Sequence, residues 1–258
     1  MLILFTERDI ASKNIAEHLM KLGFERKGEF WHYGKVRMMK TDVESVLDMP
    51  TGFETDLILV LSPHKSKAET KMLTCHVPGN WDKADFRGEN RILNTVYASK
   101  IKIMVNTMKK LAAEKLPDFE VAMEVDHHGP TCKVPILFVE IGSNEEAWQN
   151  TVAGEIVAHA VIEAIENNAE WPVAFGVGGD HYAKPFRKII FEPDNVAIGH
   201  IIPKYHLKSL AEDTFKQAIE KSVEKVTKVI VVKDDLNVEQ KKKVRELCEK
   251  FGLNYEET

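Results

Sequence analysis

The sequence predicts an α/β fold, layered around a largely parallel sheet. Short apolar runs that suit strands alternate with longer amphipathic stretches that suit helices along nearly the whole chain. Several of these runs, such as 57–61, are apolar at every position, as expected of strands buried on both faces. The 258 residues are 44% hydrophobic and 29% charged, which is typical of a globular protein with a sizeable core.

The first half of the chain predicts strands and helices in alternation. Residues 1–5 form an apolar run that meets charge at once, which indicates a first strand rather than a secretory signal. A helix follows over about 8–22, with Thr6 as its cap and Gly23 just past its end. The other elements of this half are two short strands around Gly34 within 30–41, strands at 57–61 and 72–77, and an amphipathic helix at 94–116.

The second half continues the alternation. Ser143 and Glu146 form a capping-box pattern that predicts one helix running to about residue 168. Asn237 and Gln240 form a second box that opens the last helix. The remaining elements are strands at 119–125, 136–141, 173–177, 187–192, 196–202 and 228–232, and a helix at 207–224.

Composition bounds the class of protein. We expect one domain over residues 1–258, because the sequence shows no repeat, low-complexity tract or linker. The formal charge of −5 gives no overall basic field, although a local basic groove for nucleic acid remains compatible with it. The 3 cysteines form no CxxC pair, and no apolar run approaches the roughly 18 residues that span a bilayer. These features predict a cytoplasmic protein without a membrane partner.

Polar side chains gather where predicted strands end. In open α/β sheets ligands bind beyond the carboxyl ends of the strands, because the loops converge there. Solvated loops more often carry Lys, Glu and Asn, so an enrichment of imidazoles, carboxylates and glycines predicts an active site. The residues of this kind are Ser62, His64, Lys65, Ser66, His76, His127, His128, Glu140, Gly178, Gly179, Asp180, His181 and Tyr182.

Two of these positions carry a structural condition. Glu140 lies within an apolar run, so its carboxylate needs a metal, hydrogen-bond donors or a cation, and a structural ion pair with Lys or Arg is the simpler alternative. His127 and His128 are neighbours that face opposite ways on a strand. Both can reach one site only if Gly129–Pro130 turns the chain.

Other signals are weaker. Gly178 and Gly179 could hug a phosphate or backbone, but they match no known glycine motif, and a tight turn explains them equally well. His200 and His206 could line the same cleft. Catalytic zinc is typically held by three His, Asp or Glu side chains, and this inventory allows such a site. There is no HExxH motif, so the spacing leaves the metal question open.

Four segments resemble one known family, in the family's order. They are SPHKSKAETKMLTCHVPGNW (62–81), EVDHHGPTCKVPILFVEIGSNEEAW (124–148), GVGGDHYAKPF (176–186) and GHIIPKYHL (199–207). Together they resemble the D-aminoacyl-tRNA deacylase of the archaeal and plant type. The resemblance implies a phosphorylase/hydrolase-like α/β/α fold, a zinc dependence, and hydrolysis of the ester between a D-amino acid and tRNA.

From these observations we assign expected roles to the site residues. The expected catalytic residues are His127, His128, His181 and Glu140. The expected substrate-binding residues are His64, Lys65, Ser66, Gly178, Gly179, Tyr182 and Lys184. The candidate ligands of Zn²⁺ are His76, His64 and Asp180. The expected partner is D-aminoacyl-tRNA, and no protein partner is predicted.

Two other functions compete with this interpretation. A zinc peptidase or amidohydrolase that acts on a small substrate could use the same residue types. A non-catalytic module that binds tRNA ends is the second alternative. It leaves the buried Glu140 and the imidazoles without a purpose.

Overall fold

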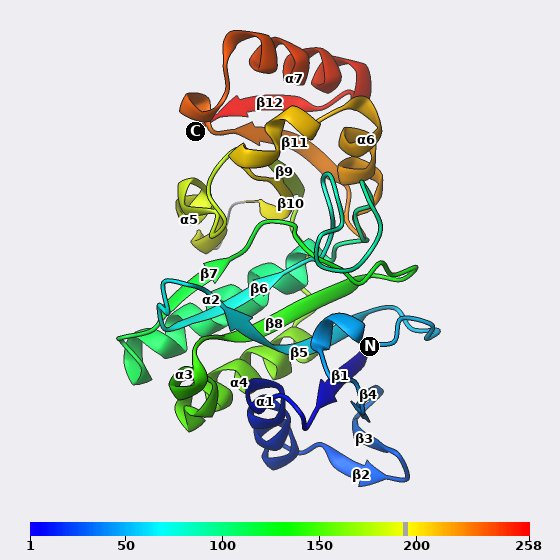
Figure 1. Ribbon diagram of the computed structural model, residues 1–258, viewed down its shortest axis with the longest axis vertical. Coiled ribbons are helices and arrows are strands. Elements are labelled where there is room, and N and C mark those ends of the chain that lie inside the picture. The colour runs from blue at the N-terminus through cyan, green and yellow to red at the C-terminus, as the bar shows by residue number, and fades with distance from the viewer. Residues whose placement is uncertain (193–195) are drawn as a thin grey trace.

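The computed structural model describes residues 1–192 and 196–258 and contains two sheets (Figure 1). The larger sheet has eight strands in the order β2-β3-β4-β1-β5-β8-β6-β7, and the smaller has four in the order β10-β9-β11-β12. Most strand pairs are parallel, with antiparallel pairs at β2-β3, β3-β4 and β6-β8. The predicted α/β class with a mostly parallel mixed sheet is therefore confirmed.

The larger sheet buries its two faces differently. Alternate side chains such as Ile3 and Leu59 face the helices, whereas Leu4 and Val60 face the segment that carries Val46. Its strands are β1 (Leu2–Thr6), β2 (Glu25–Lys27), β3 (Phe30–Tyr33), β4 (Val36–Thr41), β5 (Ile58–Lys65), β6 (Met72–His76), β7 (Glu120–Met123) and β8 (Ile136–Ser143). The helices on the first face are α1 (Ile10–Lys21), α2 (Ala98–Lys115), α3 (Glu145–Gln149) and α4 (Thr151–Glu166).

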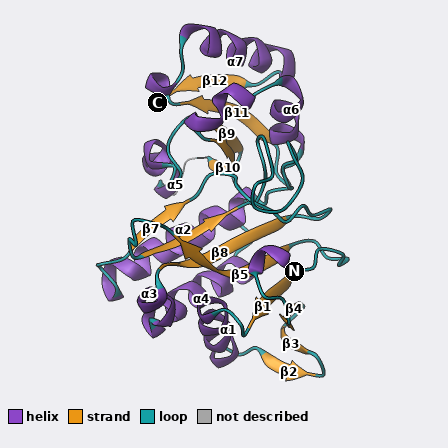
Figure 2. Cartoon of the chain, viewed as in Figure 1, coloured by secondary structure: helices purple, strands orange, loops and turns teal. Residues whose placement is uncertain are grey.

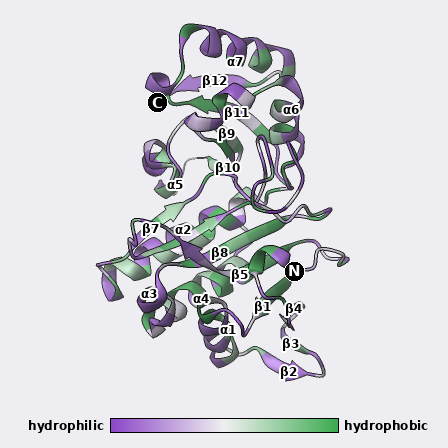
Figure 3. Ribbon diagram, viewed as in Figure 1, coloured by the Kyte–Doolittle hydropathy of each residue, from purple (hydrophilic) through white to green (hydrophobic). Residues whose placement is uncertain are grey.

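The smaller sheet is wholly parallel and is covered on both faces. Its strands are β9 (Val173–Val177), β10 (Ala197–Ile202), β11 (Val226–Val231) and β12 (Asn254–Glu257). Helices α6 (Glu212–Glu220) and α7 (Val238–Phe251) cover one face, and α2 and α5 (Arg187–Phe191) cover the other. Strands β9 and β11 are largely hydrophobic, while β12 and α7 are largely hydrophilic (Figure 3).

Helix α2 joins the two sheets. It packs against β6 and β7 of the larger sheet and against β10 of the smaller one. Long loops also lie between the sheets (Figure 2). A short 3-10 helix at Lys204–Ser209 follows β10. One domain over 1–258 stays a prediction. No helix of the described residues is long and apolar enough to cross a bilayer.

Some predicted elements were wrong, and local hydrogen bonds explain why. Residues 187–192 were predicted as a strand but form helix α5, which buries Ile190. Asp9, not Thr6, caps α1 by accepting from the Ser12 N–H. The single helix predicted to start at Ser143 is two helices, because Asn144 caps α3 and Asn150 caps α4. The capping box of Asn237 and Gln240 is confirmed.

Candidate functional site

The first part of the site lies on one face of the larger sheet. Ser62 of β5 is paired with Glu140 of β8, and Thr74 of β6 is paired with the same glutamate from the other side. His64 and His76 lie two residues beyond these partners on their own strands, so they point to the same face. We expected His64 in the loop after its strand, but it lies within β5, whereas His76 and Glu140 lie within strands as predicted. All three are held by the pairing of β8 with β5 and β6.

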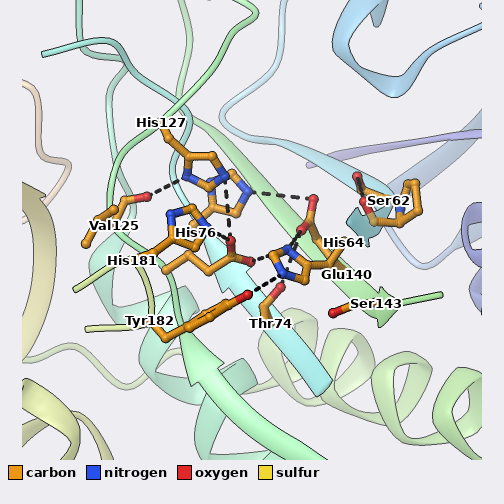
Figure 4. Close-up of polar contacts among 12 residues, drawn as sticks. Ser62, His64, Thr74, His76, Val125, His127, Glu140, Ser143, His181 and Tyr182 are labelled. Atoms are coloured by element: carbon orange, nitrogen blue, oxygen red, sulfur yellow. Dashed lines mark hydrogen bonds and ion pairs between the residues drawn. The ribbon is translucent and has the colours of Figure 1, made fainter. Parts of the chain in front are cut away.

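A glycine makes room for His64. Its partner on β8 is Gly142, where an added Cβ would lie 2.7 Å from the Cβ of His64. Any other residue at this position would push the imidazole off the sheet. The sheet therefore fixes the ring of His64 within the cluster shown in Figure 4.

The second part of the site comes from the segment after β7. His128 has a φ of 47°, and this left-handed conformation reverses the chain at Gly129. The ring centroids of His127 and His128 consequently lie 4.4 Å apart. The condition for both imidazoles to reach one site is thus met. An added Cβ at Gly129 would lie 2.3 Å from the nitrogen of Gly88, so this turn needs glycine.

The third part follows β9 of the smaller sheet. The N–H of Val125 donates to the carbonyl of His181 at 3.0 Å, which ties this loop to the His127 segment. The hydroxyl of Tyr182 lies 3.0 Å from Nε2 of His64. Segments 60 to 120 residues apart in the chain thus meet in one cluster (Figure 4).

Glu124 lies at the centre of this cluster, and the sequence analysis did not single it out. Its side chain is 0% exposed. Oε2 lies 2.7 Å from Nε2 of His181 and 3.6 Å from Nε2 of His127, and Oε1 lies 3.3 Å from Nδ1 of His64. Burial alone would raise the pKa of this carboxyl, but His64 and His181 hold it well below its usual range. Glu124 is therefore a buried anion.

His64 is a cation that lies between two carboxylates. Its Nδ1 lies 3.3 Å from Glu124 and 3.4 Å from Glu140. Burial lowers the pKa of His64, yet the two carboxylates outweigh burial and raise the pKa to about 12. The pKa of Glu140 is lowered to about 2, since His64 and His76 outweigh its burial. The alternative of an ion pair with Lys or Arg is replaced by pairing with imidazoles.

Three imidazoles form a set that fits a metal ion. Ligand nitrogens of His76, His127 and His128 all lie within 4.8 Å of one another. His76 is 0% exposed, and neither of its ring nitrogens has a hydrogen-bond partner among the described residues. Nδ1 of His127 faces the Val125 carbonyl at 2.7 Å, and Nδ1 of His128 faces its neighbouring carbonyl at 2.5 Å. These contacts leave both Nε2 atoms free to coordinate a metal.

Proton affinities in this set also suit a metal. Burial, followed by the nearby His76, lowers the pKa of His127 well below its usual value and that of His128 to about 4. Both rings are therefore neutral at physiological pH, which is the form that coordinates metals. The pKa of His76 is raised, because Glu140 outweighs its burial, and a bound cation would replace that proton.

A cavity of about 580 Å³ opens onto the cluster. Its wall is built from β5 and β8 of the larger sheet, from loops, and from segments that follow β9 and β10 of the smaller sheet. The lining residues are Asp9, Glu44, Ser45, Val46, Leu47, Ser62, Pro63, His64, Lys65, Phe86, His127, His128, Glu140, His181, Tyr205 and His206. Such a volume suits a small organic ligand.

Several predicted site residues lie elsewhere, because they serve local turns. The carboxylate of Asp180 accepts from the Lys184 N–H at 2.9 Å, and Asp180 belongs to none of the possible metal groups among the described residues. The N–H groups of Gly178 and Gly179 donate to the Ile202 carbonyl and to Asp235, so they are not free to bind substrate.

Ser66 and Lys184, two further residues expected to bind substrate, also lie outside the cavity wall. The hydroxyl of Ser66 accepts from the Ala68 N–H within its own turn. Lys184 lies near Asp180, at 3.7 Å, outside the cavity wall. Lys65 does line the cavity, with its ammonium 5.5 Å from the ring centroid of Trp148.

A second buried pair supports the histidine segment. The carboxylate of Asp126 lies 2.5 Å from Nδ1 of His200 and accepts from the Ile201 N–H at 2.6 Å. Nε2 of His200 donates to the Lys221 carbonyl at 2.8 Å. His200 therefore anchors the segment beside His127 rather than lining the cavity, whereas His206 does line it.

We expect the metal-free protein to lose stability as the pH falls from about 6.5 to about 4. The pKa of His128 is about 4 in the folded protein and 6.5 in the unfolded chain, so only the unfolded chain takes up this proton in that window. The contribution of His128 is complete above pH 6.5 and is lost toward pH 4, amounting to about 3 kcal/mol. The raised pKa of His64 acts the opposite way, because its contribution is complete below pH 6.5 and is lost only as the pH rises toward 12.

Denaturant unfolding in chelator at several pH values checks this expectation. His128→Asn should show a shallower loss of the free energy of unfolding on acidification than the unchanged protein. Equal slopes for the two proteins would contradict a neutral, buried His128.

Comparisons with known proteins place the chain in a family. The family profile described as D-aminoacyl-tRNA deacylase matches residues 51–256. The chain belongs to the D-aminoacyl-tRNA deacylase family. The family predicted from the four sequence segments is therefore confirmed.

Relatives cover nearly the whole chain. The D-aminoacyl-tRNA deacylase of Thermococcus kodakarensis is 34% identical, with 98% of each chain covered. That of Methanosarcina acetivorans is 34% identical over 97% of this chain and 90% of the relative. The crystal structure of a conserved protein of unknown function is 31% identical and superposes with a TM-score of 0.90, covering 99% of this chain and 94% of the other. This deacylase-family chain therefore shares one fold with that structure over nearly its whole length.

Proposed function

We propose that the chain hydrolyses the ester bond between a D-amino acid and the terminal ribose of tRNA. Membership of the deacylase family supports this activity, and so do relatives of that name that align over nearly the whole chain. The observation that carries the proposal is the Glu124–His181 contact of 2.7 Å at the wall of the cavity, beside the three-imidazole set. A carboxylate that orients an imidazole is the arrangement by which enzymes activate a nucleophile.

His181 is the general base of this proposal. Its Nε2–H donates to the buried anion Glu124, which fixes the tautomer and leaves Nδ1 to accept a proton. His181 lines the cavity, where a water molecule can approach the ester. The water oxygen forms a bond to the carbonyl carbon while its proton passes to Nδ1. The bond from that carbon to the ribose oxygen then breaks, and the proton passes to the ribose oxygen.

His64 supplies a fixed positive charge. Its imidazolium lies between Glu124 and Glu140 and contacts the Tyr182 hydroxyl. This charge offsets one of the two buried anions, which reduces the repulsion that the cluster exerts on the negative charge that develops on the carbonyl oxygen of the ester. His64 is a poor general base, because its pKa of about 12 keeps it protonated.

We further propose that His76, His127 and His128 hold Zn²⁺. The support is the orphaned nitrogens of His76 together with two imidazoles that are neutral and oriented by backbone carbonyls. Zinc bound there would act as a Lewis acid toward the ester or its attacking water. His76 and His64, which the sequence analysis grouped as candidate ligands, thus have separate roles in this proposal.

One assay tests the reaction, the chirality and the metal together. The protein is incubated with D-tyrosyl-tRNA and with L-tyrosyl-tRNA, with and without chelator, and release of the amino acid is measured. We expect cleavage of the D-ester alone, with loss of activity in chelator. Binding of tRNA without cleavage would instead support the non-catalytic module.

Salt dependence separates the remaining alternative. Turnover of aminoacyl-tRNA should fall steeply as ionic strength rises, because in this proposal lysines such as Lys65 bind the phosphates of the tRNA. A peptidase or amidohydrolase acting on a small neutral substrate should respond little to salt. Activity that survives high salt undiminished would favour that alternative.

A further inference from the structure

Two exposed aromatic rings line the mouth of the cavity. Phe86 is 69% exposed and Tyr205 is 55% exposed, and both contribute to the wall that also carries His64 and His181. The exposed large hydrophobic side chains among the described residues are Ile10, Phe86, Tyr205, Val223 and Val238. The aromatic members of this set thus both lie at the cavity, although burial of such rings would normally stabilise the fold.

The backbone of Phe86 is anchored although its ring is not buried. Its carbonyl accepts from the Gly129 N–H at 2.9 Å, next to His128. Its neighbour Arg87 forms an ion pair with Asp48 at 2.6 Å, and the Arg87 carbonyl accepts from Asn80 at 3.0 Å. The loop is therefore held at the histidine turn while the ring stays in solvent. Nothing within the fold requires an aromatic ring there.

Tyr205 is held in place by the loop that follows β9 of the smaller sheet. The N–H of its neighbour Lys204 donates to the Gly179 carbonyl at 3.0 Å. The Tyr205 hydroxyl lies 3.4 Å from Nδ1 of His181. The ring thus stands beside the proposed general base, at the same mouth as Phe86.

The wall of the cavity combines buried and exposed residues. Ser62 of β5 and Val46 of the 3-10 helix at Val46–Asp48 are buried, whereas the rings of Phe86 and Tyr205 are exposed and mark the open end of the cavity. When the ester carbonyl lies at the imidazole cluster, one arm of the substrate is the amino acid and the other is the terminal nucleoside. Only the nucleoside arm continues into a large macromolecule, so it must leave through the open end.

We propose that Phe86 and Tyr205 bind the terminal base of the tRNA by stacking. This assignment rests on the proposed deacylase function. Single-stranded RNA ends are commonly bound by aromatic side chains that stack on bases, each worth about 1–3 kcal/mol. The contact positions the ester at His181 and takes no part in the chemical step.

Steady-state kinetics with D-tyrosyl-tRNA and D-alanyl-tRNA test the proposal. Phe86→Ala should raise KM about 5- to 100-fold on both substrates with little change in kcat, and Phe86→Tyr should restore KM. Tyr205→Leu should behave like Phe86→Ala, whereas Tyr205→Phe should keep the stacking. Adenosine monophosphate should inhibit the unchanged protein and inhibit Phe86→Ala at least 5-fold more weakly. Val238→Ala, on the outer helix α7, serves as the matched control.

The possible failures are distinguishable. A protein that cleaves D-tyrosyl-tRNA normally while Phe86→Ala keeps its KM overturns the stacking proposal alone. A penalty with D-tyrosyl-tRNA but none with D-alanyl-tRNA overturns it too, because the ring would then contact the amino-acid side chain. If the unchanged protein cleaves neither substrate, the proposed function itself fails.

Discussion

Glu124→Gln lowers kcat/KM for D-tyrosyl-tRNA by about 10³-fold or more in our expectation. Glutamine has one acceptor oxygen where the carboxylate has two, so its NH₂ group would take either the position that faces His64 or the one that faces His127 and His181. In either orientation His181 loses the negative charge that stabilises its Nε2–H tautomer, so Nδ1 would be held less firmly as the base. Because this contact acts during the chemical step, the loss should appear in kcat.

The control for this variant is Glu120→Gln. Glu120 opens β7, the strand that directly precedes Glu124, but it is exposed and pairs with Arg187. Removing an exposed ion pair costs about 0–1 kcal/mol, so this variant should remain active and stable. Circular dichroism and thermal unfolding of both variants separate a lost base from a lost fold. Retention of more than a tenth of the activity by a folded Glu124→Gln protein would contradict the role of Glu124.

The sequence could predict a buried carboxylate where an apolar strand surrounds it. Glu140 is flanked by apolar residues on both sides, and this pattern indicated burial and a need for partners. Glu124 is just as buried, between Met123 and Val125, but the pattern was masked by the Asp-His-His run that follows. Identifying its partners requires knowing that the smaller sheet brings His181 against it, and this is a tertiary property.

The sequence could not show that β5 continues through His64. Ser62 and Pro63 suggested the end of a strand, but parallel pairing with β8 continues as far as Ser143. Pairing with a long neighbour outweighed the local turn signal. The polar residues after β9 are also ambiguous in the sequence, because the same residue types serve turns and ligand sites. Asp180 satisfies an N–H of its own turn, and the sequence does not distinguish such a residue from a ligand.

His76→Phe should separate zinc binding from folding. The imidazole is stacked 5.5 Å from Phe138 and 4.3 Å from His127, measured between ring centroids, so a phenyl ring fits the same space. In chelator the variant should still fold with a Tm close to that of the unchanged protein, because the loss of the 3.7 Å ion pair with Glu140 is offset by the removal of two buried nitrogens without hydrogen bonds. Deacylation should fall about 10²-fold or more, since one of three proposed ligands is lost.

The decisive readout is the stabilisation by zinc, because a ligand that binds only the folded state raises Tm, and raises it further the more tightly it binds. Zinc added after the chelator is removed should raise the Tm of the unchanged protein but not that of His76→Phe. His159→Phe is the matched control, since His159 lies on α4 outside the cluster and should leave the zinc effect intact. An equal rise in Tm for His76→Phe would assign the metal to other residues. The group of His64, Glu124 and His181 would then be the next to test, because its ligand atoms also lie within 4.8 Å of one another.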